Sequence, residues 1–267
     1  MTERLAHPAR LTEDAQCPIR MIDTGLVPAG RSGVRLVVHI PGEYTMAQDQ
    51  WTAVDTFFSN HLHKEDAALQ DALTTSDEAG LPQINVESNQ GKFLMLLVMA
   101  TGAKRILEIG TLGGYSTIWL GRGTPADGHI DTLELNPDNA RIAASNIKRA
   151  GLEDKVVVHI GKAVDSLKHL IRLETPPYDF IFLDADKASL PAYLEYSLRL
   201  SRPGTMILAD NVVRRGEVAN PTSINPDVQG VQRYIEMVGS NPNLETTAIQ
   251  TVGSKGYDGF AITLVKS

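Results

Sequence analysis

The sequence predicts an α/β fold in which a mostly parallel, seven-stranded sheet with an antiparallel C-terminal strand carries helices on both faces. Two observations lead to this class. Between residues 105 and 210, short apolar runs alternate with segments of helical spacing. After these, two apolar runs joined by a glycine-rich turn are typical of antiparallel strands at an edge. Repeated strand–helix units of this kind indicate a doubly wound, Rossmann-like sheet.

The individual elements follow from local patterns. Trp51, Val54, Phe57 and Phe58 recur at helical spacing and predict a helix from residue 49. Asn136 is an expected helix cap, with Pro137 at the first helical position. Further helices are expected at 65–75, 88–101, 114–122, 163–173 and 190–200. The strands are expected at 105–110, 129–135, 155–161, 178–186, 205–210, 243–252 and 258–266.

The chain divides at about residue 46. Residues 1–46 contain four prolines, four glycines and no lysine, and only 33–40 reads as a strand. We interpret them as an N-terminal extension that is either partly ordered, packing on a partner subunit, or a loose tail. Residues 47–267 form the expected main domain.

Composition limits the function classes. Lys and Arg number 25 against 32 Asp and Glu, a net charge of −7 that argues against a nucleic-acid partner. The single cysteine, Cys17, cannot form an internal disulfide or a thiolate zinc site. The first residues lack the apolar core of a secretion signal, and the longest apolar run, 93–100, is too short to span a bilayer. We therefore expect a cytoplasmic protein with no membrane association.

Four of the expected parallel strands carry an acid at or near the carboxyl end: Glu108, Glu134, Asp184 and Asp210. Ligands of open α/β sheets bind at this edge, and clustered carboxylates repel one another unless a cation or a hydroxyl-rich ligand lies among them. Glu134 is suited to accept two ribose hydroxyls. The loop after Glu108 has a GxxGG pattern rather than the GxGxxG of dinucleotide sites. A tight turn alone explains that loop equally well, but with Glu134 it favours a cationic nucleoside such as S-adenosylmethionine.

Asp184, Asp210 and Asn211 provide two carboxylates and an amide oxygen. Hard oxygen ligands of this kind suit Mg²⁺, with Ca²⁺ or Mn²⁺ as alternatives. Helix capping or a turn is the competing explanation for each of them. Lys187, three residues past Asp184, is a candidate general base if a divalent cation lies beside it, and otherwise a solvated lysine at a helix start.

The chain from about residue 49 onward resembles the cation-dependent O-methyltransferase family, which includes catechol and caffeoyl-CoA O-methyltransferases. The matching motifs, in family order, are INVESNQGKFL, RILEIGTLGGYST, DTLELNPDNA, VVVHIGKA, YDFIFLDADK and ILADNVV. The resemblance implies metal ligands Asp184, Asp210 and Asn211, and Lys187 as the catalytic base. The contacts to S-adenosylmethionine that it implies are Val86, Glu108, Gly110, Ser116, Glu134, Gly161, Ala163 and Asp184.

The function expected from this resemblance is metal-dependent methyl transfer to a hydroxyl of a small catechol-type aromatic substrate, by a homodimer. In catechol O-methyltransferases an acid near the C-terminus holds the second hydroxyl, and here Ala261 is expected at that place. Asp186 and residues 214–217 are candidate substrate contacts. Two alternatives remain open. One is O-methylation of a hydroxylated uridine in tRNA, and the other is a nucleoside-binding protein without catalysis.

Overall fold

The computed structural model describes residues 41–266, with side chains from residue 47 onward, so the expected strand at 33–40 lies outside the described residues. The helix expected from residue 49 begins earlier, at Pro41. The helices of the described chain are α1 (Pro41–Leu62), α2 (Ala67–Glu78), α3 (Ser88–Thr101), α4 (Tyr115–Gly123), α5 (Pro137–Arg149), α6 (Ala163–Arg172), α7 (Leu190–Arg199), the 3₁₀ turn η1 (Arg214–Ala219) and α8 (Pro226–Ser240).

Within residues 41–266, one sheet of seven strands is present, in the order β3-β2-β1-β4-β5-β7-β6. Its strands are β1 (Arg105–Ile109), β2 (His129–Glu134), β3 (Val156–Ile160), β4 (Tyr178–Leu183), β5 (Ser201–Ala209), β6 (Leu244–Gly253) and β7 (Gly256–Val265). Neighbouring strands from β3 to β5 are parallel, whereas β7 runs antiparallel to both β5 and β6. This confirms the expected fold class, including the C-terminal hairpin.

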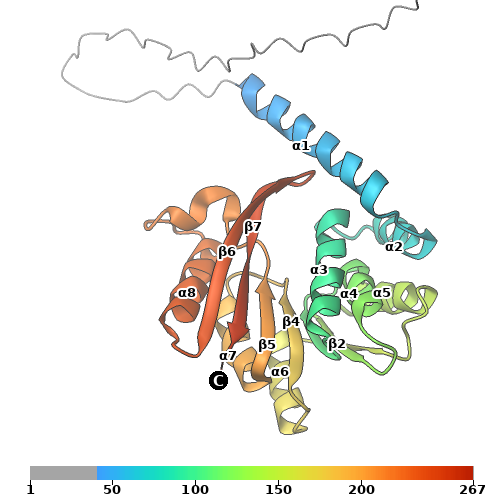
Figure 1. Ribbon diagram of the computed structural model, residues 1–267, viewed down its shortest axis with the longest axis vertical. Coiled ribbons are helices and arrows are strands. Elements are labelled where there is room, and N and C mark those ends of the chain that lie inside the picture. The colour runs from blue at the N-terminus through green and yellow to red at the C-terminus, as the bar shows by residue number, and fades with distance from the viewer. Residues whose placement is uncertain (1–40, 267) are drawn as a thin grey trace, which may run out of the picture. The chain divides into compact units, whose positions relative to one another are not determined.

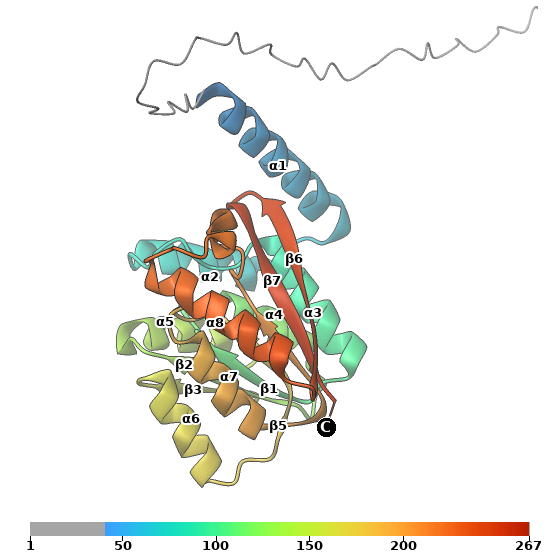
Figure 2. The same ribbon diagram turned by 90° about the vertical axis from the view of Figure 1, so that its left-hand side faces the viewer.

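Helices cover both faces of the sheet (Figures 1 and 2). One buried cluster joins the sheet to α2, α3, α4 and α5, and the other joins it to α6, α7 and α8. The central strands are apolar on both faces for this reason, and their side chains read as continuous hydrophobic runs. Ile106 and Phe180 lie in the first cluster, while Leu107 and Ile181 lie in the second.

Local signals explain where several elements begin and end. Asn136 caps α5 by accepting a hydrogen bond from the backbone N–H of Asp138 at 2.8 Å, with Pro137 in the first turn as expected. Gly102 ends α3 in a left-handed conformation that favours glycine. Strand β4 ends at Leu183, before the expected limit at residue 186, so Asp184 and Lys187 lie in the loop that follows it.

Candidate active site

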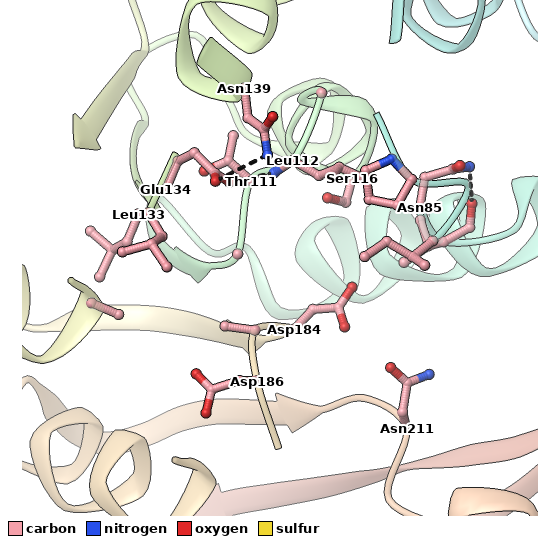
Figure 3. Close-up of a pocket in the computed structure, with 18 of the residues that line it drawn as sticks. Asn85, Thr111, Leu112, Ser116, Leu133, Glu134, Asn139, Asp184, Asp186 and Asn211 are labelled. Atoms are coloured by element: carbon pink, nitrogen blue, oxygen red, sulfur yellow. Dashed lines mark hydrogen bonds between the residues drawn. The ribbon is translucent and has the colours of Figure 1, made fainter. Parts of the chain in front are cut away.

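A cavity of about 780 Å³ opens at the carboxyl ends of β1, β2 and β4. This is where the sheet order changes direction, because β2 and β3 lie on one side of β1, and β4 and β5 lie on the other. In Figure 3, Thr111 and Glu134 lie on one wall of this cavity. Asp184, Asp186 and Asn211 lie on the opposite wall. Strand ends that are far apart in the sequence therefore meet in one place.

Gly110 allows the turn after β1 to approach the loop after β4. Its φ of +105° is a conformation that L side chains rarely adopt, and a Cβ atom there would lie 2.3 Å from the carbonyl oxygen of Asp184. The backbone N–H of Asp184 in turn donates to the carbonyl of Ile109 at 2.8 Å. Gly110 and Asp184, both expected to contact the methyl donor, therefore line the same cavity.

Glu134 ends β2 with its carboxylate held in place from the neighbouring turns. The backbone N–H groups of Leu112 and Asn136 donate to it at 2.8 and 2.9 Å, and the amide of Asn139 lies 3.4 Å away. Glu134 is nearly buried but still lines the cavity. The position agrees with the expected role of a carboxylate that accepts ribose hydroxyls.

Glu108 has a different environment from the one expected. It is fully buried, it is absent from the residues that line the cavity, and its carboxylate accepts hydrogen bonds from the hydroxyls of Ser116, Thr117 and Thr132. Burial raises the pKa of Glu108 to about 7, although these hydrogen bonds oppose the shift. Glu108 thus positions Ser116, which does line the cavity.

The other residues expected to contact the methyl donor also divide into those that line the cavity and those that support its wall. Val86 and Ala163 line the cavity. Gly161 does not, but its backbone N–H donates to the carbonyl of Glu134 at 2.8 Å and so sets the turn that brings Ala163 to the wall.

A second cavity of about 750 Å³ adjoins the first, and Val86, Asn211 and Arg214 line both. The expected metal ligands lie at this junction: Asp184 faces the first cavity, Asp210 the second, and Asn211 both. Lys187 lines the first cavity, almost fully buried, with its Nζ 2.8 Å from Oδ1 of Asp184. The structure therefore brings together Asp184, Asp210, Asn211 and Lys187.

Asp210 is the most strongly perturbed carboxylate of this group. Burial, followed by the charge of Asp184, raises its pKa to about 7, and Lys187 offsets only part of this shift. Gln90 on α3 donates to Oδ2 of Asp210 at 2.7 Å, and the backbone N–H of Asn211 donates to Oδ1 at 2.8 Å. Asn211 adopts a left-handed backbone with φ of 53°, an uncommon conformation that orients it at the junction.

Two expectations about the substrate side meet different outcomes. Asp186 lines the first cavity, where it accepts hydrogen bonds from the backbone of Ser189 and the hydroxyl of Tyr193. Ala261, expected where the family has a substrate-holding acid, is fully buried opposite Ala209 within the sheet and lines neither cavity. Tyr257 and Asp258, at the start of β7, line the second cavity instead.

Sequence reasoning missed Gln90 and Gly230. Gln90 lies in a motif that carried the resemblance, but only tertiary contact reveals its bond to Asp210. Gly230 lies on α8, where a Cβ atom would be 2.2 Å from the carbonyl oxygen of Lys187. The signal for α8 is present in the sequence as a cap, Asn225, followed by Pro226 and buried residues at helical spacing.

The family model described as O-methyltransferase matches residues 59–265. The chain belongs to the O-methyltransferase family. It is 49% identical over 214 residues to the catechol O-methyltransferase of Niastella koreensis, an alignment that covers 80% of this chain and 97% of the relative. It is 47% identical over 213 residues to the catechol O-methyltransferase of Mycobacterium tuberculosis, covering 80% of this chain and 95% of that one.

Solved structures agree with this assignment. An O-methyltransferase from Bacillus cereus, in complex with SAH (S-adenosylhomocysteine), superposes with a TM-score of 0.81 at 52% identity, covering 82% of this chain and 100% of that one. An O-methyltransferase from Streptomyces achromogenes involved in tomaymycin synthesis, in complex with S-adenosylmethionine, gives a TM-score of 0.80 at 46% identity, covering 82% and 99%.

This O-methyltransferase is therefore an enzyme that uses S-adenosylmethionine as methyl donor. The first cavity, with Gly110 and Glu134 on its wall, lies where nucleosides bind in sheets of this topology. No helix within residues 41–266 is long and apolar enough to cross a membrane.

Proposed function

We propose that this O-methyltransferase transfers the methyl group of S-adenosylmethionine to a hydroxyl of a catechol-type acceptor, with a divalent cation held by Asp184, Asp210 and Asn211. The observation that carries the proposal is the meeting of two carboxylates and an amide at the junction of two cavities. In this arrangement the donor occupies the first cavity and the acceptor the second.

The chemistry of these side chains fits a divalent cation. All three offer oxygen ligands, which Mg²⁺, Ca²⁺ and Mn²⁺ prefer. Burial and then the charge of Asp184 raise the pKa of Asp210, and a cation between the two carboxylates would favour their ionised forms. No group of three or more His, Cys, Asp or Glu side chains with metal-binding geometry occurs among the described residues, so the set depends on the Asn211 amide.

The bound cation would lower the pKa of the acceptor hydroxyl and hold it in place. Lys187 lies beside Asp184 and, as the neutral amine, takes the hydroxyl proton at Nζ in this proposal. The acceptor oxygen then forms a bond to the methyl carbon as the bond from that carbon to sulfur breaks, leaving S-adenosylhomocysteine. Burial of Lys187 and Asp210 limits water at the reacting atoms, so positioning supplies much of the rate.

Two relatives, from Niastella koreensis and Mycobacterium tuberculosis, are catechol O-methyltransferases, which supports a catechol as acceptor. A vicinal diol presents two oxygens to one cation, which suits a site that has three protein ligands and open positions. The same reasoning favours Mg²⁺ over Zn²⁺, because nitrogen and sulfur ligands are missing from the set.

Metal removal tests this proposal. Excess EDTA should abolish methyl transfer from S-adenosylmethionine to catechol, and added Mg²⁺ should restore it. Thermal melts with and without EDTA check that the fold persists. Undiminished turnover in excess chelator would exclude a catalytic metal.

Substitution of Asp210 tests the ligand set itself. Asp210→Ala should lower kcat by about 100-fold or more, since it removes a ligand of the cation, while the Kd for S-adenosylhomocysteine changes little. Asp165→Ala, an exposed acid on α6, is the matched control. Equal losses of donor binding and turnover in Asp210→Ala would indicate that Asp210 only maintains the fold.

A further inference from the structure

The second cavity is lined by three cationic side chains. Arg214 and Arg215 come from η1, and Lys255 comes from the turn between β6 and β7. These segments are far apart in the sequence, and only the packing of the C-terminal hairpin beside η1 brings them to one cavity. The cavity is the one that the proposed function assigns to the acceptor.

Acids also line this cavity, but backbone and amide donors already engage them. Oδ1 of Asp258 accepts from the backbone N–H groups of Val213 and Arg214, each at 3.0 Å. Glu87 accepts from the hydroxyl and backbone of the β6–β7 turn. Glu217 accepts from the amide of Asn220 at 3.2 Å. These carboxylates are therefore oriented toward protein donors.

Two of the three cations, Arg215 and Lys255, form no ion pair within the described residues. Over the described part of the chain, no carboxylate lies within 4.0 Å of the charged nitrogens of Arg215 or Lys255. Lys255 Nζ donates to the backbone carbonyls of Asn85 and Gln83. Burial lowers the pKa of Lys255, and the charges of neighbouring acids offset this only in part.

The guanidinium of Arg214 forms fewer hydrogen bonds within the described residues than it can donate. One nitrogen, Nη2, pairs with Asp227 on α8 at 3.3 Å, whereas Nε is buried without a hydrogen-bond partner among the residues described. Buried donors in native proteins are nearly always satisfied, so the guanidinium of Arg214, which lines both cavities, keeps hydrogen-bonding capacity that its protein neighbours do not use. Arg214 and Arg215 also both have left-handed backbones, with φ of 54° and 55°, a strain that is found most often at functional sites.

We propose that the acceptor carries an anionic group, a carboxylate on the catechol ring, and that Arg214, Arg215 and Lys255 bind it in the second cavity. This inference rests on the proposed function and adds the charge class of its substrate. A guanidinium matches the planar geometry of a carboxylate, and the lysine adds a point charge beside it. Specificity then comes from the charges of Arg215 and Lys255, which a neutral or cationic acceptor would leave without an anionic partner.

Kinetics with three acceptors test the inference. The full-length enzyme, with S-adenosylmethionine and Mg²⁺, is assayed on 3,4-dihydroxybenzoate, on unsubstituted catechol and on dopamine, which carries an ammonium group. We expect kcat/KM to be highest for the carboxylate by about tenfold over catechol, the change that one hydrogen bond to a charged group supplies, and lowest for the amine. Added salt should raise KM for the carboxylate more than KM for catechol.

Variants assign the preference to these residues. Arg214→Gln should lower the ratio of kcat/KM for dihydroxybenzoate over catechol about tenfold, mainly by raising KM for the carboxylate. Lys255→Gln and Arg215→Gln should each lower it about threefold, because both side chains are exposed. Arg172→Gln, an exposed arginine on α6, is the matched control and should keep the ratio. If Arg214→Gln unfolds through loss of its ion pair with Asp227, the ratio measured for Lys255→Gln decides whether the inference holds.

The outcomes separate the two proposals. Transfer to catechol without preference for the carboxylate, or a preference that survives both Lys255→Gln and Arg215→Gln, overturns the inference and leaves the proposed function intact. Absence of transfer to every catechol, or transfer to a hydroxylated uridine in tRNA instead, overturns both.

Discussion

Single contacts decide how the candidate ligands face the two cavities. The hydrogen bond from Gln90 to Oδ2 of Asp210 fixes one oxygen of that carboxylate, and the backbone of Asn211 fixes the other. If Asp210 holds the cation as proposed, Gln90 is a positioning residue that acts through Asp210. Groups that orient metal ligands in this way affect metal affinity nearly as strongly as some ligands do.

Gln90→Ala should therefore raise the Mg²⁺ concentration required for half-maximal activity by about 10–100-fold. Titration of activity with Mg²⁺, and calorimetry of Mg²⁺ binding, measure the effect. Gln70→Ala, on the exposed side of α2, should leave the requirement unchanged. An unaltered Mg²⁺ requirement in Gln90→Ala, with the fold intact, would contradict the positioning role.

Asp131 is the centre of a buried polar network outside the candidate site. It accepts hydrogen bonds from His159 and from the Tyr178 hydroxyl, both at 2.7 Å, and pairs with His129 at 3.0 Å. Burial raises the pKa of Asp131, but these hydrogen bonds and the histidine charges outweigh it, so the pKa lies below its usual value. The ionised form therefore stabilises the fold above the unfolded-state pKa of about 3.9, and this contribution is lost as the pH falls through the folded-state value.

Asp131→Asn should lower the free energy of unfolding at pH 7 by about 1–3 kcal/mol, since it leaves buried groups imperfectly paired. The difference from the native protein should shrink below about pH 4. Urea unfolding at a series of pH values measures both effects. Asp138→Asn, an exposed member of a surface ion pair, should change stability little at any pH. A constant difference down to pH 2 would refute the assignment to Asp131.

At the scale of elements, α8 supports the loop that carries Lys187, the proposed base. Gly230 brings the helix against the backbone of Lys187 so closely that a Cβ atom would lie 2.2 Å from its carbonyl oxygen. A Cβ atom at Gly239, on the same helix, would meet nothing within 4 Å. Comparing alanine substitutions at the two glycines therefore separates the effect of helix propensity from the effect of contact with the Lys187 loop.

Gly230→Ala should lower kcat and stability together, because α8 or the loop of Lys187 must move to admit the methyl group. Gly239→Ala should retain activity and gain about 0.5–1 kcal/mol of stability from helix propensity. Steady-state kinetics and urea unfolding of both variants provide the test. Equal behaviour of the two would show that α8 does not control the position of Lys187.

At the scale of the whole molecule, donor binding should couple to global stability. The first cavity draws its wall from segments that follow β1, β2, β3 and β4, so a ligand there contacts both halves of the sheet. A ligand that binds only the folded state raises its stability by mass action. The homodimer expected from the family resemblance stays a prediction for light scattering to test.

S-adenosylhomocysteine at 100 times its Kd should add about 2.7 kcal/mol of stability and raise Tm by about 5–10 °C. NAD at the same concentration should leave Tm unchanged, because the loop after Glu108 lacks the dinucleotide glycine pattern. Differential scanning calorimetry measures both. A matching shift with NAD would indicate a general nucleotide site in the first cavity.

The sequence alone determined the sheet, its C-terminal hairpin and the strand-end acids. Hydrophobic periodicity and the succession of strands and helices along the chain can be read directly from the residues. From these it predicted the proximity of Asp184, Asp210 and Asn211, since parallel strands end at one edge. Tertiary structure decided the rest. The carboxylate of Glu108 accepts hydrogen bonds from three hydroxyls and does not line the cavity. Ala261 is buried in the core, and Gln90 donates a hydrogen bond to Asp210, which lies 120 positions later in the sequence. Such side-chain directions depend on which elements pack together, and no local pattern encodes them.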